Sequence, residues 1–221
     1  MTHTANATLT DVHDMVVVHR AFRREFGLLP GLVRAVRPGD TVRAGVVAGH
    51  ARMILKGLHL HHTAEDDLLW PKLLERAAPE AALIARMEGQ HEQVEHHLDR
   101  LGPALDRWQA EARPAVTEEA ASTLEALATV LLVHLDEEER EILPVAARHI
   151  SPAEWAELGD HGIAAMSRSE LPILFGAVLE EATPEETVEM VAKLPLPARL
   201  LLRPVLLPRY RRYVRRVRGT R

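Results

Sequence analysis

The sequence predicts an all-α protein, with an antiparallel up-down four-helix bundle followed by an additional C-terminal helical region. No segment alternates between apolar and polar residues as a half-buried strand does. Apolar residues instead recur at helical spacing, and many of them are alanine and leucine, which favour helices. Prolines and turn-forming residues divide the first part of the chain into four long segments. Long helices with short connections pack antiparallel to their neighbours.

The ends of the four long helices follow from capping and turn residues. The first helix is expected to begin after Thr8 or Thr10, with a kink at Pro30. Asp40 ends a turn that contains proline and glycine and is a candidate N-cap for the second helix, and Pro79 suits the first turn of the third. We therefore expect helices at residues 10–36, 41–78, 79–108 and 117–148.

A different pattern begins near residue 150. Ser151 and Thr183 each precede a proline and stand three residues before a glutamate, which is the pattern of a capping box. With the segment between them, these boxes predict helices at residues 152–160, 168–182 and 184–193, before a basic helix at the end of the chain. We divide the chain into a bundle domain at 10–148 and a C-terminal helical extension with a basic tail at 149–221.

Composition excludes several classes of protein and site. The chain has no cysteine, which excludes thiolate metal ligands, disulfides and cysteine nucleophiles. No signal peptide and no transmembrane segment are recognisable, so we expect a cytoplasmic protein. Residues 190–221 contain ten basic residues and no acid, which leaves the first 189 residues at −15 within a formal net charge of −5. No nucleic-acid-binding motif accompanies the basic tail, so no nucleic-acid partner is expected.

Two parts of the chain repeat one histidine–glutamate pattern. Each copy has a histidine and, 42 or 43 residues later, a second histidine that stands four residues before a glutamate. An acid, apolar residues and a proline follow each glutamate. The members are His19, His61 and Glu65 in one copy, and His91, His134 and Glu138 in the other. The bundle therefore contains two copies of one helix pair.

Helical spacing places these side chains in the bundle interior. Residues four apart share a helix face, so the histidine and glutamate of each pair can point to one centre. His19 shares its stripe with Met15 and Phe22, and His91 shares its stripe with Met87. Two buried carboxylates without basic partners would cost several kcal/mol, and a pair of cations removes that cost. Imidazole and carboxylate ligands without thiolate suit iron, manganese or zinc.

These residues resemble the ligand pattern of the hemerythrin-like (HHE cation-binding) domain family, as do the Leu-Leu-Trp-Pro after Glu65 and the Ile-Leu-Pro after Glu138. The resemblance covers about residues 10 to 148. It implies a bundle of hemerythrin-like type that holds two iron ions, bridged by carboxylates and an oxo or hydroxo group, with manganese or zinc less expected. By this resemblance, His19 and His61 bind one iron, His91 and His134 bind the other, and Glu65 and Glu138 bridge them.

Neighbouring residues have roles that the pattern leaves open. Oxygen-carrying hemerythrins have a second histidine four residues after the third-helix histidine, where this chain has Glu95. We take Glu95 as a candidate catalytic acid that completes the coordination or handles protons, the alternative being a residue of the helix surface. His62 is a further candidate metal ligand, although the repeat aligns it with a leucine. Asp66 and Glu139 are expected to support the ligands from outside or to face solvent.

The predicted function is binding of, or reaction with, dioxygen, peroxide or nitric oxide at a carboxylate-bridged di-iron centre. A peroxidase-like or catalase-like activity is one form of this function. The alternatives are a di-iron oxygenase that activates oxygen to oxidise an organic substrate, and an iron, oxygen or redox sensor that signals to a partner. A substrate pocket beside the metals would favour the oxygenase, and a sealed site would favour the small ligand.

Overall fold

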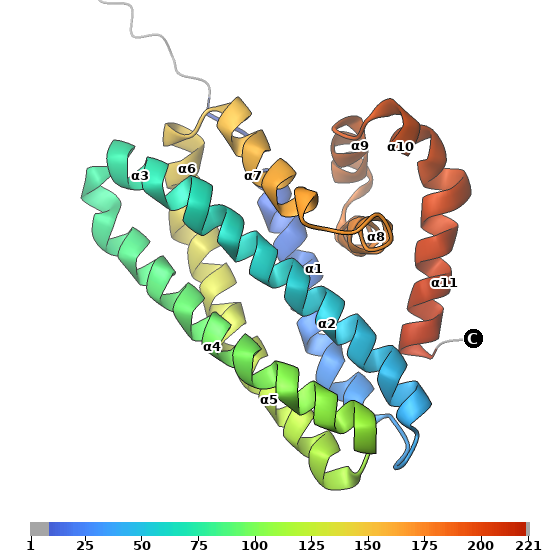
Figure 1. Ribbon diagram of the computed structural model, residues 1–221. Coiled ribbons are helices and arrows are strands. Elements are labelled where there is room, and N and C mark those ends of the chain that lie inside the picture. The colour runs from blue at the N-terminus through green and yellow to red at the C-terminus, as the bar shows by residue number, and fades with distance from the viewer. Residues whose placement is uncertain (1–8, 220–221) are drawn as a thin grey trace, which may run out of the picture.

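The computed structural model describes residues 9–219, and within this range the chain is helical, with short turns and no strand (Figure 1). The α-helices are α1 (His13–Arg34), α2 (Thr41–Ala64), α3 (Trp70–Arg76), α4 (Ala81–Glu111), α5 (Pro114–Glu137), α6 (Leu143–His149), α7 (Pro152–Ala164), α8 (Leu171–Glu181), α9 (Pro184–Ala192), α10 (Leu196–Leu201) and α11 (Leu207–Arg218). Shorter segments join some of them: η1 (Glu65–Leu69), η3 (Glu138–Ile142) and η4 (Leu202–Leu206) are π-helical, and η2 (Ala78–Glu80) is a 3-10 turn. The predicted all-α class is confirmed. No helix among the described residues has both the length and the apolar character needed to cross a membrane.

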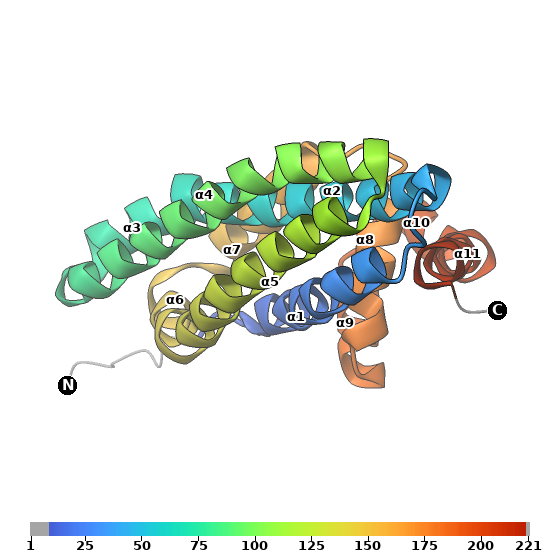
Figure 2. The ribbon, with the colours of Figure 1, turned by 90° about the horizontal axis from the view of Figure 1, so that it is seen from below.

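Four long helical rods form the bundle. They are α1, α2 continued by η1 and α3, α4, and α5 continued by η3 and α6. Each rod packs against two others, in the order α1, α2, α4, α5 around the bundle. Figures 1 and 2 show that successive rods run in opposite directions, with the α1–α2 and α4–α5 turns at one end and with α3 and α6 at the other. The predicted antiparallel up-down arrangement is therefore confirmed.

The predicted helix caps form. The Asp40 side chain accepts a hydrogen bond from the backbone N–H of Arg43 and so caps α2. Ser151 and Thr183 each accept from the backbone of a glutamate three residues later, whose side chain bonds back to the capping residue. These reciprocal bonds fix the starts of α7 and α9.

The first helix begins slightly later than predicted and contains its proline. Of the two expected starting points, Thr8 lies outside the described residues, and α1 begins at His13, after Thr10. The Thr10 hydroxyl donates to the carbonyl of Ile150 and ties the entry of the bundle to the end of α6. Pro30 lies inside α1, which continues past it to Arg34.

Two π-helical turns lie at equivalent places in two rods, and the sequence analysis did not predict them. η1 begins at Glu65 and η3 begins at Glu138, and each ends two residues before a proline, Pro71 or Pro144. A proline has no N–H group, and its ring collides with the carbonyl four residues earlier. The wider π-helical turn makes room for the proline ring. In each turn the residue before the proline donates its N–H to the glutamate carbonyl five residues earlier.

Two apolar clusters fill the bundle on either side of a polar layer. One contains Phe22, Leu58, Val94 and Leu131, and the other contains Met15, Leu69, Met87 and Ile142. Along every rod, the predicted metal-binding residues fall between members of the two clusters. Apolar side chains therefore close the polar layer above and below along the bundle axis.

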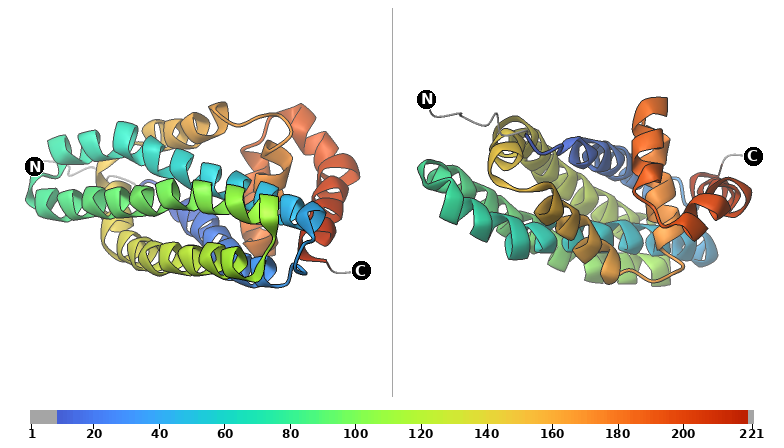
Figure 3. Two further views of the ribbon diagram at one scale, coloured as in Figure 1. Left: turned by 60° about the horizontal axis from the view of Figure 1, so that its bottom comes forward. Right: turned by 90° about the horizontal axis from the view of Figure 1, so that it is seen from above.

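The helices after the bundle pack along one side of it. Helix α7 lies against α2 and η1, α8 against α1, and α11 against α8 and α2, as Figures 1 and 3 show. Helices α8 and α11 approach closely at Gly176, which has no Cβ atom. A Cβ atom there would collide with the ring of Tyr210. A side chain larger than hydrogen at position 176 would push α11 away.

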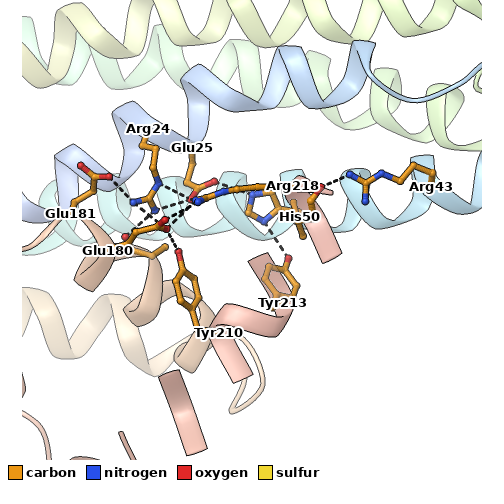
Figure 4. Close-up of polar contacts among 11 residues, drawn as sticks. Arg24, Glu25, Arg43, His50, Glu180, Glu181, Tyr210, Tyr213 and Arg218 are labelled. Atoms are coloured by element: carbon orange, nitrogen blue, oxygen red, sulfur yellow. Dashed lines mark hydrogen bonds and ion pairs between the residues drawn. The ribbon is translucent and has the colours of Figure 1, made fainter. Parts of the chain in front are cut away.

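A buried ionic network attaches α11 to the bundle (Figure 4). The Glu25 carboxylate on α1 is 2 % exposed and contacts His50 Nε2 at 3.0 Å and Arg218 Nη2 at 3.1 Å. His50 Nδ1 also lies 3.2 Å from the hydroxyl of Tyr213 on α11. Burial by itself would raise the pKa of Glu25, but the contacts with His50 and Arg24 outweigh burial and hold it at about 2. Glu25 is therefore ionised and holds three helices together.

Candidate metal centre

The predicted ligands lie together in the polar layer, and all four rods contribute. His19 lies on α1, His61 near the end of α2, His91 on α4 and His134 on α5, while Glu65 and Glu138 are the first residues of η1 and η3. All are buried except His61, whose side chain is 12 % exposed. Two sets of four residues offer ligand atoms that lie within 4.8 Å of one another: His19, His61, Glu65 and Glu138, and His62, Glu65, His91 and His134.

Each set contains a close pair of imidazole nitrogens. The Nε2 atoms of His19 and His61 lie 3.2 Å apart, and those of His91 and His134 also lie 3.2 Å apart. Two nitrogens bound to one cation at about 2.1 Å stand about 3 Å apart when they meet at roughly a right angle. The spacing of both pairs therefore fits shared coordination of an ion.

Hydrogen bonds at the opposite ring nitrogens decide which tautomer two of the histidines adopt. His19 Nδ1 lies 2.9 Å from Glu139 Oε1, and His91 Nδ1 lies 2.6 Å from Asp66 Oδ1. An ionised carboxylate only accepts, so each imidazole carries its proton on Nδ1 and directs an Nε2 lone pair into the centre.

His134 has the same orientation through an amide. Its Nδ1 lies 3.1 Å from Gln90 Oε1, while the Gln90 amide nitrogen donates to Glu137 at 2.6 Å. The amide oxygen is thus left to accept the Nδ1 proton of His134. The Nε2 atoms of His91 and His134 face each other across 3.2 Å, at a spacing that a shared cation would fit.

The outer carboxylates have further partners that hold them in place. Glu139 also accepts from Arg23 Nη1 at 2.6 Å, and Asp66 also accepts from the indole N–H of Trp70 at 2.8 Å. The Arg23 contact keeps the Glu139 side chain ionised, since hydrogen bonds from His19 and Arg23 overcome the effect of burial and lower its pKa. Asp66 and Glu139 thus hold two of the predicted ligands, His91 and His19, from outside the centre.

The two glutamates of the centre have no hydrogen-bond partner. All four carboxylate oxygens of Glu65 and Glu138 are buried and receive no hydrogen bond from the described residues. Glu65 Oε1 lies 3.4 Å from His61 Nε2, and Glu65 Oε2 lies 3.5 Å from His91 Nε2. Glu138 Oε2 lies 3.5 Å from the Nε2 atoms of both His19 and His134. Each carboxylate therefore stands between the two nitrogen pairs.

Burial shifts the pKa values of the histidines and the glutamate that point into the centre. It lowers the pKa of His61 and His62 well below 6.5, helped by neighbouring histidines, and lowers that of His134 to about 2. Burial, followed by the charge of Glu138, raises the pKa of Glu65 well above 4.5. Neutral imidazole is the form that binds metal, and ionised carboxylates at this depth require nearby cations. The donor chemistry and the unpartnered oxygens therefore fit metal ions.

His62 joins the second set although the repeat aligns it with Leu135. Its ring is 4 % exposed and stacks on His91 with 4.1 Å between ring centroids, and its Nε2 has no hydrogen-bond partner among the described residues. The buried stripe of this rod runs through Leu58, His62 and Glu65 at helical spacing, which is the sequence signal for its inward position. The two sets are therefore unequal, with two histidines in one and three in the other.

Glu95, the candidate catalytic acid, lies at the helix surface and is not among the ligand atoms of the two sets. Its carboxylate is 48 % exposed and pairs with the exposed imidazole of His59 at 3.0 Å. The buried stripe of α4 runs from Met87 through His91 to Val94, so the next residue lies on the flank that faces solvent. The helix-surface alternative describes this residue.

The role of Gln90 was not recognised in the sequence. It precedes His91 on α4, yet it serves His134 of the next rod. Spacing along one helix gives no signal for such a contact, because the contact depends on how two rods align. The π-helical turns at Glu65 and Glu138 did have a signal, namely the prolines six residues after each glutamate.

The comparison with known protein families agrees with this geometry. The model of the hemerythrin HHE cation-binding domain matches residues 10–146, which include both glutamates and all the histidines of the centre. No curated protein and no solved structure matches the chain. The match spans more than half of the sequence and ends within α6, the last helix of the four rods. With its repeated histidines and glutamates inside four antiparallel rods, the chain belongs to the hemerythrin HHE cation-binding domain family.

Proposed function

We propose that this protein holds two iron ions in the bundle and that its loaded centre binds or reacts with dioxygen, peroxide or nitric oxide. The observation that carries the proposal is the set of four buried carboxylate oxygens on Glu65 and Glu138. They lie between two pairs of imidazole nitrogens and receive no hydrogen bond within residues 9–219. An unpartnered buried carboxylate is costly, and two cations between these groups remove the cost.

In this proposal each residue has a defined task. His19 and His61 hold one ion, His91 and His134 hold the other, and His62 adds a third nitrogen to the second position. Glu65 and Glu138 bridge the two positions. This is supported by Glu65, which presents one oxygen to His61 and the other to His91.

Iron is favoured over the other metals that suit these ligands. Imidazole and carboxylate without thiolate accommodate iron, manganese and zinc, so the donor set by itself leaves three candidates. Membership of the hemerythrin family favours iron among them. When bound, a pair of irons supplies electrons to a small oxidant or a coordination position for a diatomic gas.

The surroundings favour a small ligand over an organic substrate. The two apolar clusters close the centre along the bundle axis and exclude bulk water from it. A surface depression of about 660 Å³ is lined by Thr41, Arg52, Asp106, Gln109 and Ala110, none of which belongs to the centre. A second, smaller depression, which includes His13, Asp14 and Glu186, also contains none of the proposed ligands, so neither depression places an organic substrate beside the centre.

Metal content and visible absorption of anaerobically purified protein test the proposal. The protein is produced with ample iron and measured before and after exposure to air, peroxide and nitric oxide. We expect two irons per chain and a new ligand-to-iron absorption band with at least one of these ligands. Absence of iron, or zinc alone, would overturn the assignment. So would a fully loaded protein whose spectrum does not respond to any of the three.

A further inference from the structure

The segment from α10 to α11, which we call the C-terminal arm (residues 196–218), exposes apolar side chains. Within it Leu196, Leu200, Leu201 and Val205 are 66, 68, 49 and 48 % exposed. No residue of α10 is buried, although most of its residues are leucine or alanine. Isolated exposed aliphatic residues are ordinary, but three leucines and a valine within ten residues form a local apolar patch.

The same arm carries arginines whose guanidinium groups have no partner. Helix α11 turns Tyr210 and Val217 towards the protein and leaves an outer face of exposed arginines. They are Arg209, Arg211, Arg212, Arg215 and Arg216. None of these side chains makes a hydrogen bond or an ion pair with the part of the chain that the structure describes.

Some other exposed arginines of the protein have acidic partners. Arg34 and Arg76 lie at the surface of the bundle, and each pairs with one or more glutamates. In the arm, only Arg218 finds such partners, at Glu25 and Glu180, and this contact anchors α11. Residues 190–221 themselves contain no acid with which the remaining arginines could pair.

We propose that the C-terminal arm docks the protein onto an anionic lipid bilayer. Arginine forks bind phosphate headgroups through paired N–H groups, and exposed leucines beside them insert at the boundary between headgroups and acyl chains. Basic residues adjoining apolar ones give two independent contributions to binding at such a surface. The apolar contribution comes from α10 and η4, since the apolar face of α11 already packs on the protein.

The charge of the rest of the protein fixes its orientation in this proposal. The arm and the residues around it carry ten basic groups and no acid, against −15 on the first 189 residues. An anionic surface attracts the arm and repels the body. Figures 1 and 3 show the arm at the outer edge of the molecule, beyond α8. A flat bilayer could therefore contact the arm.

The phosphates of a nucleic acid would pair with the arginines, but a nucleic acid would not bury the exposed leucines. Duplex contacts are dominated by phosphates, which need only the basic face. The four exposed aliphatic residues are the observation that favours lipid. The two partners therefore differ in how binding depends on Leu200 and Leu201.

Co-sedimentation of the full-length protein with vesicles tests the proposal. The vesicles are phosphatidylcholine alone or phosphatidylcholine mixed with phosphatidylglycerol. We expect binding to the mixed vesicles only, weakened by salt. The triple change Arg209→Ser, Arg212→Ser and Arg216→Ser should reduce partitioning roughly tenfold or more. The matched control removes the same charge from exposed, unpaired arginines elsewhere, with Arg37→Ser, Arg100→Ser and Arg168→Ser, and should reduce it much less.

A second pair of variants separates lipid from nucleic acid. Leu200→Ser with Leu201→Ser should weaken vesicle binding several-fold, while the control Val42→Ser with Val133→Ser, at residues 82 and 59 % exposed, should not. Equal thermal melting shows that each variant is folded. The proposal is overturned by absent binding to the mixed vesicles or by equal losses in the arm and control arginine variants. It is also overturned if duplex DNA displaces the vesicles and the leucine variants bind like the parent.

Discussion

His91 donates its Nδ1–H to Asp66 across 2.6 Å, and the two residues come from opposite copies of the sequence repeat. The reverse contact exists as well, since His19 of the first copy bonds to Glu139 of the second. In each case the acid follows a glutamate of the centre. The acid of one half therefore orients a histidine of the other half, which makes the centre a joint product of both.

Asp66→Asn should weaken metal binding roughly 10- to 100-fold, the usual effect of losing a carboxylate behind a histidine ligand. The amide oxygen is a weaker acceptor for the Nδ1 proton of His91, and it must also accept the hydrogen bond from the Trp70 indole N–H. Competition with a chelator measures the affinity. Asp67→Asn is the matched control because Asp67 is exposed and, among the described residues, makes only a 3.7 Å contact with His161. Equal affinities for the two variants would contradict the role of Asp66.

His62→Leu should lower the affinity for one of the two ions by about tenfold or more, because leucine restores the apolar residue that the repeat has at position 135 and removes one nitrogen. Stepwise metal titration should then show one strong and one weakened site. His59→Leu removes an exposed histidine from the same helix and should leave both sites intact. Two unchanged sites in His62→Leu would remove His62 from the ligand set.

Glu95→Gln should leave iron content and the spectral response to peroxide unchanged. Its exposed pair with His59 contributes less than roughly 1 kcal/mol to stability, so melting should change little as well. Iron analysis and stopped-flow absorption provide the measurements. A loss of reactivity with full iron content would restore Glu95 as a catalytic residue and would require its side chain to turn inward.

Glu65→Gln should have opposite effects on the metal-free and the loaded protein. Without metal, the change removes a buried acid whose ionisation burial opposes, and the free energy of unfolding should rise by roughly 1–3 kcal/mol. With iron present, the variant should lose metal and the stability that metal confers. Urea unfolding with and without chelator compares the two states, and exposed Glu92→Gln serves as the control. A variant that destabilises the metal-free protein would indicate that the glutamate has a structural partner.

Glu25→Gln should destabilise the attachment of α11 at neutral pH. The pKa of Glu25 is about 2 in the folded protein against an ordinary 4.5, so its contribution is present above 4.5 and is lost as pH falls towards 2. This shift corresponds to at most about 3 kcal/mol. The groups that face Glu25 are Arg24, His50 and Arg218, with Glu180 beyond Arg218.

Unfolding free energies across this pH range test the prediction for Glu25. The parent should lose stability between pH 4.5 and 2 more steeply than the variant. Exposed Glu88→Gln should retain the parent profile. Parallel profiles for parent and Glu25→Gln would show that the network does not depend on the charge of Glu25.

The sequence by itself determined the helical class, the capping residues and the six repeated histidine and glutamate positions that the fold brings together. These features are local, since a cap needs three residues and two ligands four apart need one helix face. The face of each helix is also set locally, and the stripe through Leu58, His62 and Glu65 was readable in this way.

Only the tertiary structure decided how the rods align. Alignment places Gln90 behind His134, crosses the acids Asp66 and Glu139 between the two halves, and leaves Glu95 in solvent beside His59. These contacts join residues from different rods, and their geometry depends on small rotations and shifts that helical periodicity does not specify. The same reason separates Arg218, which pairs with Glu25, from the arginines of α11 that remain exposed.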